Sequence, residues 1–207
     1  MSNCETADLP VVEAEPHQFR EVLRCIIHTI VFNRSLGYVQ PVDVDSELFD
    51  VTYVRCKDPA LEATVEAKIS EFCALMERRP AAAATLRIGF YQTRKKAQWF
   101  GSKDERLYWE QWYINLAVLE TEAIGTPDGD AAAAAAHAHT EAALRAAMRE
   151  VVRVVNERRD HIPPVMSASE VTFPFDITIA GGSKTGLEAK LHEVKKMVLQ
   201  TAPPPML

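Results

Sequence analysis

Few residues of this 207-residue chain have types and spacing that suit catalysis. The glycine-rich segment 181–186 resembles a phosphate-binding loop, whose backbone N–H groups would cradle phosphates. However, Ser183 stands directly before Lys184, where that loop requires a glycine, so a turn followed by a helix start explains the segment better. The sequence contains neither a Gly-x-Ser-x-Gly nor a His-Glu-x-x-His pattern. The absence of a complete catalytic motif therefore predicts that the chain is not an enzyme.

The remaining titratable residues also lack partners at catalytic spacing. On a helix, His137 and His139 would point away from each other, because residues two apart do not share a face. Glu110 lies beside Trp109 in an expected strand, and one carboxylate does not make a mechanism. His28 lies in an apolar helical pattern, which predicts a buried, hydrogen-bonded core histidine. The four cysteines are scattered without a Cys-x-x-Cys pair, so we expect no disulfide, no metal and no cofactor.

Two adjacent aromatic residues, Trp99 and Phe100, are the feature that most needs an explanation. They lie within the polar segment 91–106, which reads as a turn, and turn chemistry requires neither residue type. Burying both rings on a partner would remove about 300–500 Å² from water, or about 10 kcal/mol before association costs of about 4–15 kcal/mol. Because association costs consume much of the burial energy, the aromatic pair suits recruitment of a partner better than permanent assembly. The alternative is that both rings fold back onto the chain's own core.

A basic triplet, Arg94-Lys95-Lys96, precedes the aromatic pair. Near an anionic membrane three cations contribute about 3 kcal/mol, and Trp99 and Phe100 could insert beside them. This combination predicts, as an alternative function, a membrane-surface binding module. A solvated strand end that discourages edge pairing is the simpler structural explanation of the triplet.

Composition and charge exclude several other classes of protein. The net charge of −6 argues against a general nucleic-acid binder, which needs a basic face. The longest apolar runs are far too short to span a membrane. The segment Met1–Glu5 lacks the basic and apolar regions of a signal peptide, so we expect a cytoplasmic protein.

Hydrophobic periodicity and turn residues predict four helices and five strands. The expected helices cover about residues 16–33, 58–79, 131–161 and 187–198, and the expected strands cover about residues 9–15, 49–56, 86–91, 108–119 and 171–179. Residues 38–47 read as a loop. This order predicts an α+β fold in which helices pack on one face of an antiparallel sheet. We expect a single domain over residues 1–202 and a frayed, proline-rich tail over residues 203–207, with Trp99 and Phe100 at the tip of a protruding β-hairpin.

Several blocks of the chain, taken together, closely resemble the autophagy-related protein 101 family. The most specific blocks are Phe90–Phe100 and Trp109–Trp112. Further matches are His28-Thr29, Arg34–Gly37, Phe49–Arg55, Val155–Arg158 before Pro163-Pro164, and Phe175–Thr178. The resemblance runs over nearly the whole chain.

The resemblance implies a small HORMA-fold protein that acts as a non-catalytic adaptor of the autophagy-initiation complex. It implies a heterodimer in which the chain pairs with and stabilises the HORMA domain of autophagy-related protein 13. It also implies a Trp/Phe finger, here Trp99 and Phe100, that recruits downstream factors at the autophagosome formation site. By analogy with HORMA pairing, we expect the partner on the helix over residues 138–160.

This sequence departs from the family at the finger. Family members commonly have a proline between the two aromatic residues, whereas Trp99 and Phe100 are adjacent here. Because adjacent residues in an extended loop point to opposite sides, the two rings need not enter one pocket. A third interpretation, a HORMA module that clasps a peptide under a C-terminal segment, is disfavoured by the short chain after Ile179.

Overall fold

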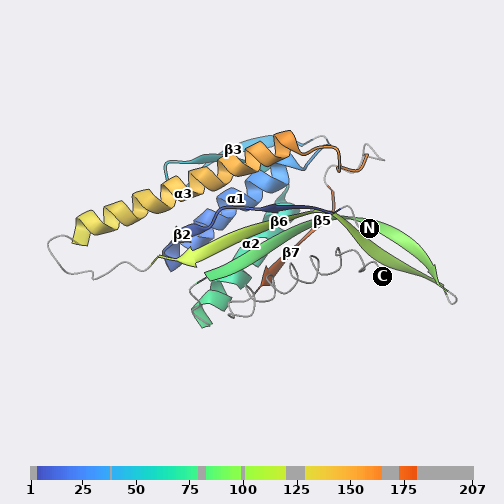
Figure 1. Cartoon of the computed structure of the whole chain (residues 1–207), viewed down its shortest axis with the longest axis horizontal. Helices are drawn as coiled ribbons and strands as arrows, with labels where there is room; N and C mark the ends of the chain where they lie inside the picture. The colour runs from blue at the N-terminus through green and yellow to red at the C-terminus, as the bar shows by residue number, and fades with distance from the viewer. Residues whose placement is uncertain are drawn as a thin grey trace, which may run out of the picture.

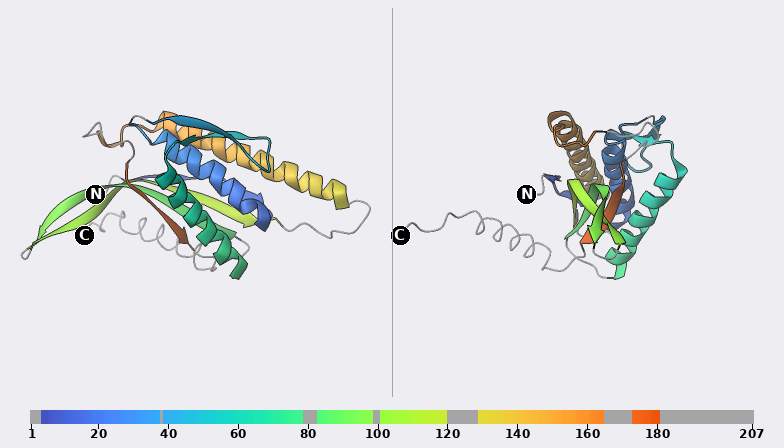
Figure 2. Two further views of the ribbon diagram at one scale, coloured as in Figure 1. Left: turned by 180° about the vertical axis from the view of Figure 1, so that it is seen from behind. Right: turned by 90° about the vertical axis from the view of Figure 1, so that its right-hand side faces the viewer.

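Three helices pack on one face of a five-stranded sheet in the part of the chain that the structure describes (Figures 1 and 2). The computed structural model of the chain describes residues 4–37, 39–78, 83–98, 101–119, 129–164 and 173–180. A separate two-stranded sheet lies beside the helices (Figure 1). The α+β class predicted from the sequence is confirmed.

The larger sheet is mostly antiparallel, with the order β1-β6-β5-β7 and with β2 also paired to β6. Its strands are β1 (Glu5–Asp8), β2 (Val12–Ala14), β5 (Ala83–Gln98), β6 (Gly101–Val118) and β7 (Phe175–Ala180). β5 is antiparallel to β6 and β7, as predicted, whereas β1 and β2 run parallel to β6. A long connection that contains two helices separates β2 from β6, as parallel pairing requires.

Two short strands replace the single strand predicted over residues 9–15. β1 ends at Asp8 and β2 begins at Val12. Pro10 lies between them, and a proline has no N–H to contribute to a strand ladder. The predicted strand over residues 171–179 is confirmed only from Phe175 onward within the described residues.

The core lies between the sheet and the helices, and alternation along the strands places it there. Leu86 pairs in register with Ile114 and Ile88 with Trp112, and all four are buried. Their neighbours on the opposite face, such as Arg87, are partly exposed. Since alternate residues of a strand point to opposite faces, the described helices cover one face, and no described helix covers the other.

The helices begin where the sequence predicts. α1 (Phe19–Asn33) follows the 3₁₀ turn η1 (Pro16–Gln18), α2 covers Pro59–Arg78, and α3 covers Gly129–Glu157. Asp58 caps α2, because its Oδ1 accepts hydrogen bonds from the backbone N–H groups of Ala60 at 2.9 Å and Leu61 at 3.2 Å. Thus both proline-marked helix starts in the sequence are confirmed.

The prediction of a loop over residues 38–47 is wrong. β3 (Pro41–Asp45) pairs antiparallel with β4 (Thr52–Cys56) and forms the smaller sheet, which packs on α1. Its pattern is a weak alternation in which half-buried Val42 and Val44 lie between exposed neighbours. The strand predicted from residue 49 begins at Thr52 instead, because Ser46 Oγ accepts the backbone N–H of Phe49 and holds a turn there.

His28 is buried, as predicted, and stacks on Tyr53 with ring centroids 5.8 Å apart. The expected hydrogen bond is wrong for one ring nitrogen, because Nδ1 has no partner among the described residues. Burial, with a smaller contribution from the nearby Arg55 cation, lowers the pKa of His28 to about 4. The ring is therefore neutral in the folded protein at neutral pH.

Several predictions concern residues outside the described ranges. These are the helix over residues 187–198, the tail over residues 203–207 and the placement of Trp99 and Phe100. Within the described ranges, no helix is long and apolar enough to cross a membrane. The same ranges contain no cluster of three or more potential metal ligands.

Candidate protein-interaction site

The β5–β6 hairpin projects beyond the rest of the sheet (Figure 1). The pairing of β7 with β5 ends at Phe90, and the pairing of β1 with β6 ends at Glu110. From there residues 91–98 and 101–108 pair only with each other among the described strands, in eight further register pairs. One further backbone contact lies at the root, where the Tyr91 N–H donates to the Pro174 carbonyl at 3.0 Å. We call this segment the projecting ribbon. At about 3.3 Å per residue it is roughly 25 Å long.

The projecting ribbon corrects the predicted strand ends. The sequence predicts strands that stop at Tyr91 and start at Tyr108, with a polar loop between them, whereas the ladder continues to the pair Gln98 and Gly101. Mutual pairing satisfies the backbone groups of both arms, so polar side chains on both faces do not prevent a strand. Trp99 and Phe100 are the two residues between the ends of this ladder, and they lie outside the described residues.

Two cations of the ribbon's β5 arm are aligned with carboxylates of its β6 arm. Arg94 pairs in register with Glu105, and Lys95 pairs with Asp104, and all four side chains are exposed. Opposite charges at paired positions stabilise a two-stranded ribbon by about 0.2–1 kcal/mol per pair. The positive charge of the basic triplet is therefore partly balanced by carboxylates of the other arm. Its third member, Lys96, is described only by its backbone.

An aromatic cluster packs beneath the root of the ribbon, on the helix-covered face. The register shifts between Phe90 and Tyr91, a β-bulge that leaves Trp109 as the extra residue of β6. The Trp109 ring lies 5.5 Å from Phe90 and 4.9 Å from Phe173, measured between centroids. His161 packs on Trp109 at 5.8 Å. The bulge thus turns a large ring into the core where the ribbon leaves the sheet.

A buried ion pair adjoins this aromatic cluster. Arg34 and Glu110 are 2% and 1% exposed, and Arg34 Nε donates to Glu110 Oε2 at 2.8 Å and to Oε1 at 3.0 Å. The same carboxylate accepts a hydrogen bond from Trp112 Nε1 and lies 2.6 Å from His161 Nε2. Arg34 also donates to the backbone carbonyl of Arg158 at 3.3 Å. One cluster thereby ties together α1, β6 and the segment after α3.

Sequence reasoning missed the pairing of Arg34 with Glu110. The two residues are 76 positions apart, and no local pattern links them. The sequence does mark each of them as a charged residue beside an apolar stretch. His137 and His139 point to different partners, as predicted, since His137 contacts the Leu48 carbonyl and His139 contacts Glu13.

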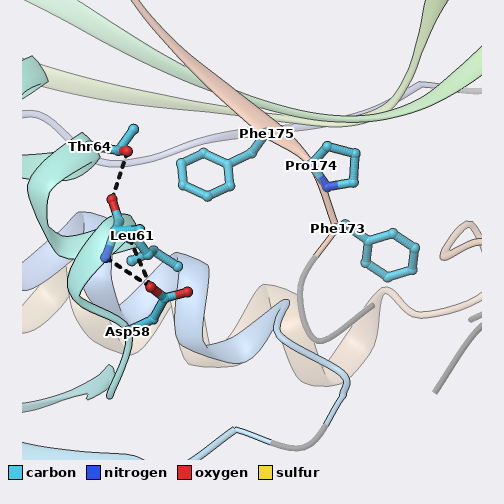
Figure 3. A pocket seen from close by; sticks show the side chains of 7 residues that line it. Asp58, Leu61, Thr64, Phe173, Pro174 and Phe175 are labelled. Carbon is cyan, nitrogen blue, oxygen red and sulfur yellow. Dashed lines mark hydrogen bonds between the residues drawn. The ribbon is translucent and has the colours of Figure 1, made fainter. Parts of the chain in front are cut away.

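An open pocket of about 290 Å³ lies near the root, between the first turns of α2 and the chain before β7. It is lined by Asp58, Ala60, Leu61, Thr64, Phe173, Pro174 and Phe175 (Figure 3). The ring of Phe175 points toward α2, and the Asp58 carboxylate is occupied in capping that helix (Figure 3). The lining is mainly apolar and holds one titratable group, so it suits packing against an apolar side chain.

Comparison with known proteins identifies the relatives of the chain. The family model described as Autophagy-related protein 101 matches residues 11–169. The Autophagy-related protein 101 of Arabidopsis thaliana is 37% identical over 99% of this chain and 99% of its own length. The proteins of the same description from Schizosaccharomyces pombe and Homo sapiens are 25% and 28% identical, over 87% and 84% of this chain and 88% and 82% of their own lengths.

Proposed function

The chain belongs to the autophagy-related protein 101 family, and we propose that it is a non-catalytic adaptor that recruits downstream autophagy factors through Trp99 and Phe100. Membership of this family supports a role in autophagy. The observation that carries the finer proposal is the ladder that runs to Gln98 and Gly101, on either side of the aromatic pair. A ribbon of roughly 25 Å leads the chain away from the core, which favours display of the rings over burial beneath the chain's own side chains.

We place the second contact, with the HORMA domain of autophagy-related protein 13, on α3. One face of this helix packs into the core through Leu144 and Val151, while Val152 on another face is 47% exposed. We place the interface on this outward face of the helix by analogy with the pairing of HORMA domains. In this proposal the chain stabilises its partner by forming the heterodimer in the cytoplasm, and the heterodimer is recruited to the autophagosome formation site.

Substitution of both finger residues tests the proposal. The variant Trp99→Ala/Phe100→Ala should keep its thermal midpoint and its binding to the purified HORMA domain of autophagy-related protein 13. The complex that contains it should no longer retain downstream autophagy factors in a pull-down. Leu107→Ala is the matched control, because Leu107 is an exposed apolar residue of the same ribbon, 42% exposed, that lies away from the tip.

A lower thermal midpoint or aggregation of the double variant would overturn the proposal, because it would identify both rings as core residues. Unchanged recruitment by a well-folded double variant would also overturn it. Either result can be read directly against Leu107→Ala, which should behave as wild type in all three measurements.

The membrane-surface alternative has one observation in its favour, the exposure of Arg94 and Lys95 on the ribbon. It requires binding to vesicles that contain phosphatidylserine, weakened by salt and lost in Arg94→Gln/Lys95→Gln/Lys96→Gln. The alignment of Arg94 and Lys95 with carboxylates favours the adaptor over this alternative. Binding to neutral and anionic vesicles should therefore be equally weak.

A further inference from the structure

The projecting ribbon needs a contact that sets its direction relative to the sheet. Two strands that pair only with each other are marginally stable in water and twist more strongly than the strands of a larger sheet. Neither β7 nor β1 extends along the ribbon, since their pairing ends at Phe90 and Glu110. Contacts at the root must therefore determine where the tip of the hairpin points.

One carboxylate of β7, on the face of the sheet opposite the helices, gathers side chains from two other strands. Asp176 of β7 accepts a hydrogen bond from Tyr108 Oη at 2.5 Å and from Arg106 Nη1 at 3.3 Å, both on the β6 arm of the ribbon. Arg87 of β5 lies 3.6 Å from the other carboxylate oxygen of Asp176. We call these four residues the Asp176 cluster.

Cation–π and ring contacts complete the Asp176 cluster. The Arg87 guanidinium lies over the Tyr108 ring at 5.3 Å, and the Arg106 guanidinium lies over the Tyr91 ring at 4.7 Å. The two tyrosines meet edge to face at 5.6 Å between centroids. Tyr91 and Tyr108 form the first register pair of the ribbon. The contacts therefore join the sheet to the ribbon directly at the bulge.

Gly89 makes this arrangement possible. A Cβ at this position would lie 2.8 Å from Cε1 and 2.9 Å from Cδ1 of Tyr108, closer than real carbon contacts allow. Gly89 pairs in register with Asp176, so the absence of a side chain lets the Tyr108 ring lie across β5 and reach β7. An alanine here would push the ring away from the Asp176 carboxylate.

We propose that Asp176 is a positioning residue that fixes the direction of the projecting ribbon through Tyr108 and Arg106. Because Asp176 belongs to β7, the ribbon keeps its direction only while β7 stays paired with β5. Displacement of β7 by a partner would release the ribbon. The hydrogen bond to the Asp176 carboxylate also raises the pKa of Tyr108, which provides a spectroscopic signature of the contact.

Nuclear magnetic resonance of the full chain tests the proposal without any partner. In wild type, backbone amides of Thr93, Arg94 and Lys95 should have order parameters near those of Leu86 and Ile88, about 0.85. In Asp176→Asn and in Gly89→Ala, the ribbon values should fall toward about 0.6, while the sheet values stay unchanged. Residual dipolar couplings of the ribbon should shrink relative to those of the sheet.

Two further variants separate positioning from general destabilisation. Tyr108→Phe keeps the ring over Gly89 but loses the hydrogen bond, so it should give a smaller loss of order than Gly89→Ala. Asp8→Asn is the matched control, because Asp8 accepts a hydrogen bond from Asn115 at 2.6 Å, away from the ribbon. In a spectrophotometric titration, the pKa of Tyr108 should fall in Asp176→Asn and stay raised in Asp8→Asn.

Unchanged order parameters and couplings in both Asp176→Asn and Gly89→Ala would overturn the inference, as would equal losses in Asp8→Asn. The positioning of the ribbon by Asp176 does not rest on the proposed function, but the purpose of that positioning, to present Trp99 and Phe100 to a partner, does. Loss of ribbon order with unchanged recruitment would refute that purpose, whereas intact recruitment by Trp99→Ala/Phe100→Ala would refute the proposed function. If neither the inference nor the proposed function is refuted, Asp176→Asn should weaken recruitment several-fold and leave pairing with the HORMA partner unchanged.

Discussion

Removal of the buried Arg34 side chain should destabilise the fold more than removal of any surface charge. In Arg34→Met the Glu110 carboxylate stays 1% exposed and loses both hydrogen bonds that the guanidinium donates, at 2.8 and 3.0 Å. Its remaining contacts, from Trp112 Nε1 and His161 Nε2, do not replace the lost cation. Breaking one side of a buried ion pair costs about 3–5 kcal/mol. For a chain of this size the loss corresponds to roughly 6–20 °C in thermal midpoint.

A double variant tests whether the uncompensated Glu110 charge causes the loss of stability. In Arg34→Met/Glu110→Leu no buried charge is left behind, although Trp112 Nε1 loses its acceptor, at a cost of about 1–3 kcal/mol. The double variant should therefore be more stable than Arg34→Met. Urea unfolding followed by tryptophan fluorescence measures both free energies, since Trp109 and Trp112 lie within the cluster.

Arg153→Met is the matched control, because Arg153 pairs with Glu150 and Glu157 on the exposed side of α3. Its urea midpoint should stay close to that of wild type, since water screens exposed pairs. The expected cost of the uncompensated charge is refuted if Arg34→Met unfolds at the wild-type urea concentration. It is also refuted if the double variant is less stable than the single one.

Three further predictions concern the body of the fold. His28 has a folded pKa of about 4, below its ordinary value, so the unfolded chain binds the proton first and stability falls as the pH drops below about 6.5. The free energy of unfolding should decrease by about 2 kcal/mol from this group between pH 7.5 and 5, a slope that His28→Leu removes in urea titrations at the two pH values. Asp58→Ala should cost about 1 kcal/mol by uncapping α2, measured by thermal unfolding, whereas exposed Asp43→Ala should cost less than about 0.5 kcal/mol. Leu86→Ala should cost about 2–5 kcal/mol in urea unfolding, because Leu86 is fully buried in the sheet and the substitution leaves a cavity.

Local chemistry explains which elements could be predicted from the sequence. Pro16 and Asp58 mark helix starts whose capping needs no distant residue, and both predictions are confirmed. Alternation identified the sheet core around Ile88, because one face of the strand is buried and the other is not. β3 was missed because its alternation is carried by only two valines, and its pairing with β4 supplies the rest of its stability.

The root of the hairpin could not be predicted, because its structure depends on distant residues and not on local chemistry. The arms of the ribbon are polar on both faces, so no periodicity shows that they are strands, and only their mutual pairing makes them so. The contacts of Glu110 with Arg34 and of Tyr108 with Asp176 join residues 76 and 68 positions apart. Such pairs depend on the tertiary fold. A glycine weakens a strand in general, whereas the structure shows that Gly89 makes room for a ring.

Complementation in Arabidopsis cells that lack the 37%-identical relative tests the central claim most directly. Wild-type chain and Leu107→Ala should restore autophagosome formation. Trp99→Ala/Phe100→Ala should fail to restore it, although it accumulates to the same level and co-purifies with the HORMA domain of autophagy-related protein 13. Full restoration by the double variant would contradict the account, because the aromatic pair would then not be the surface through which the adaptor recruits its partners.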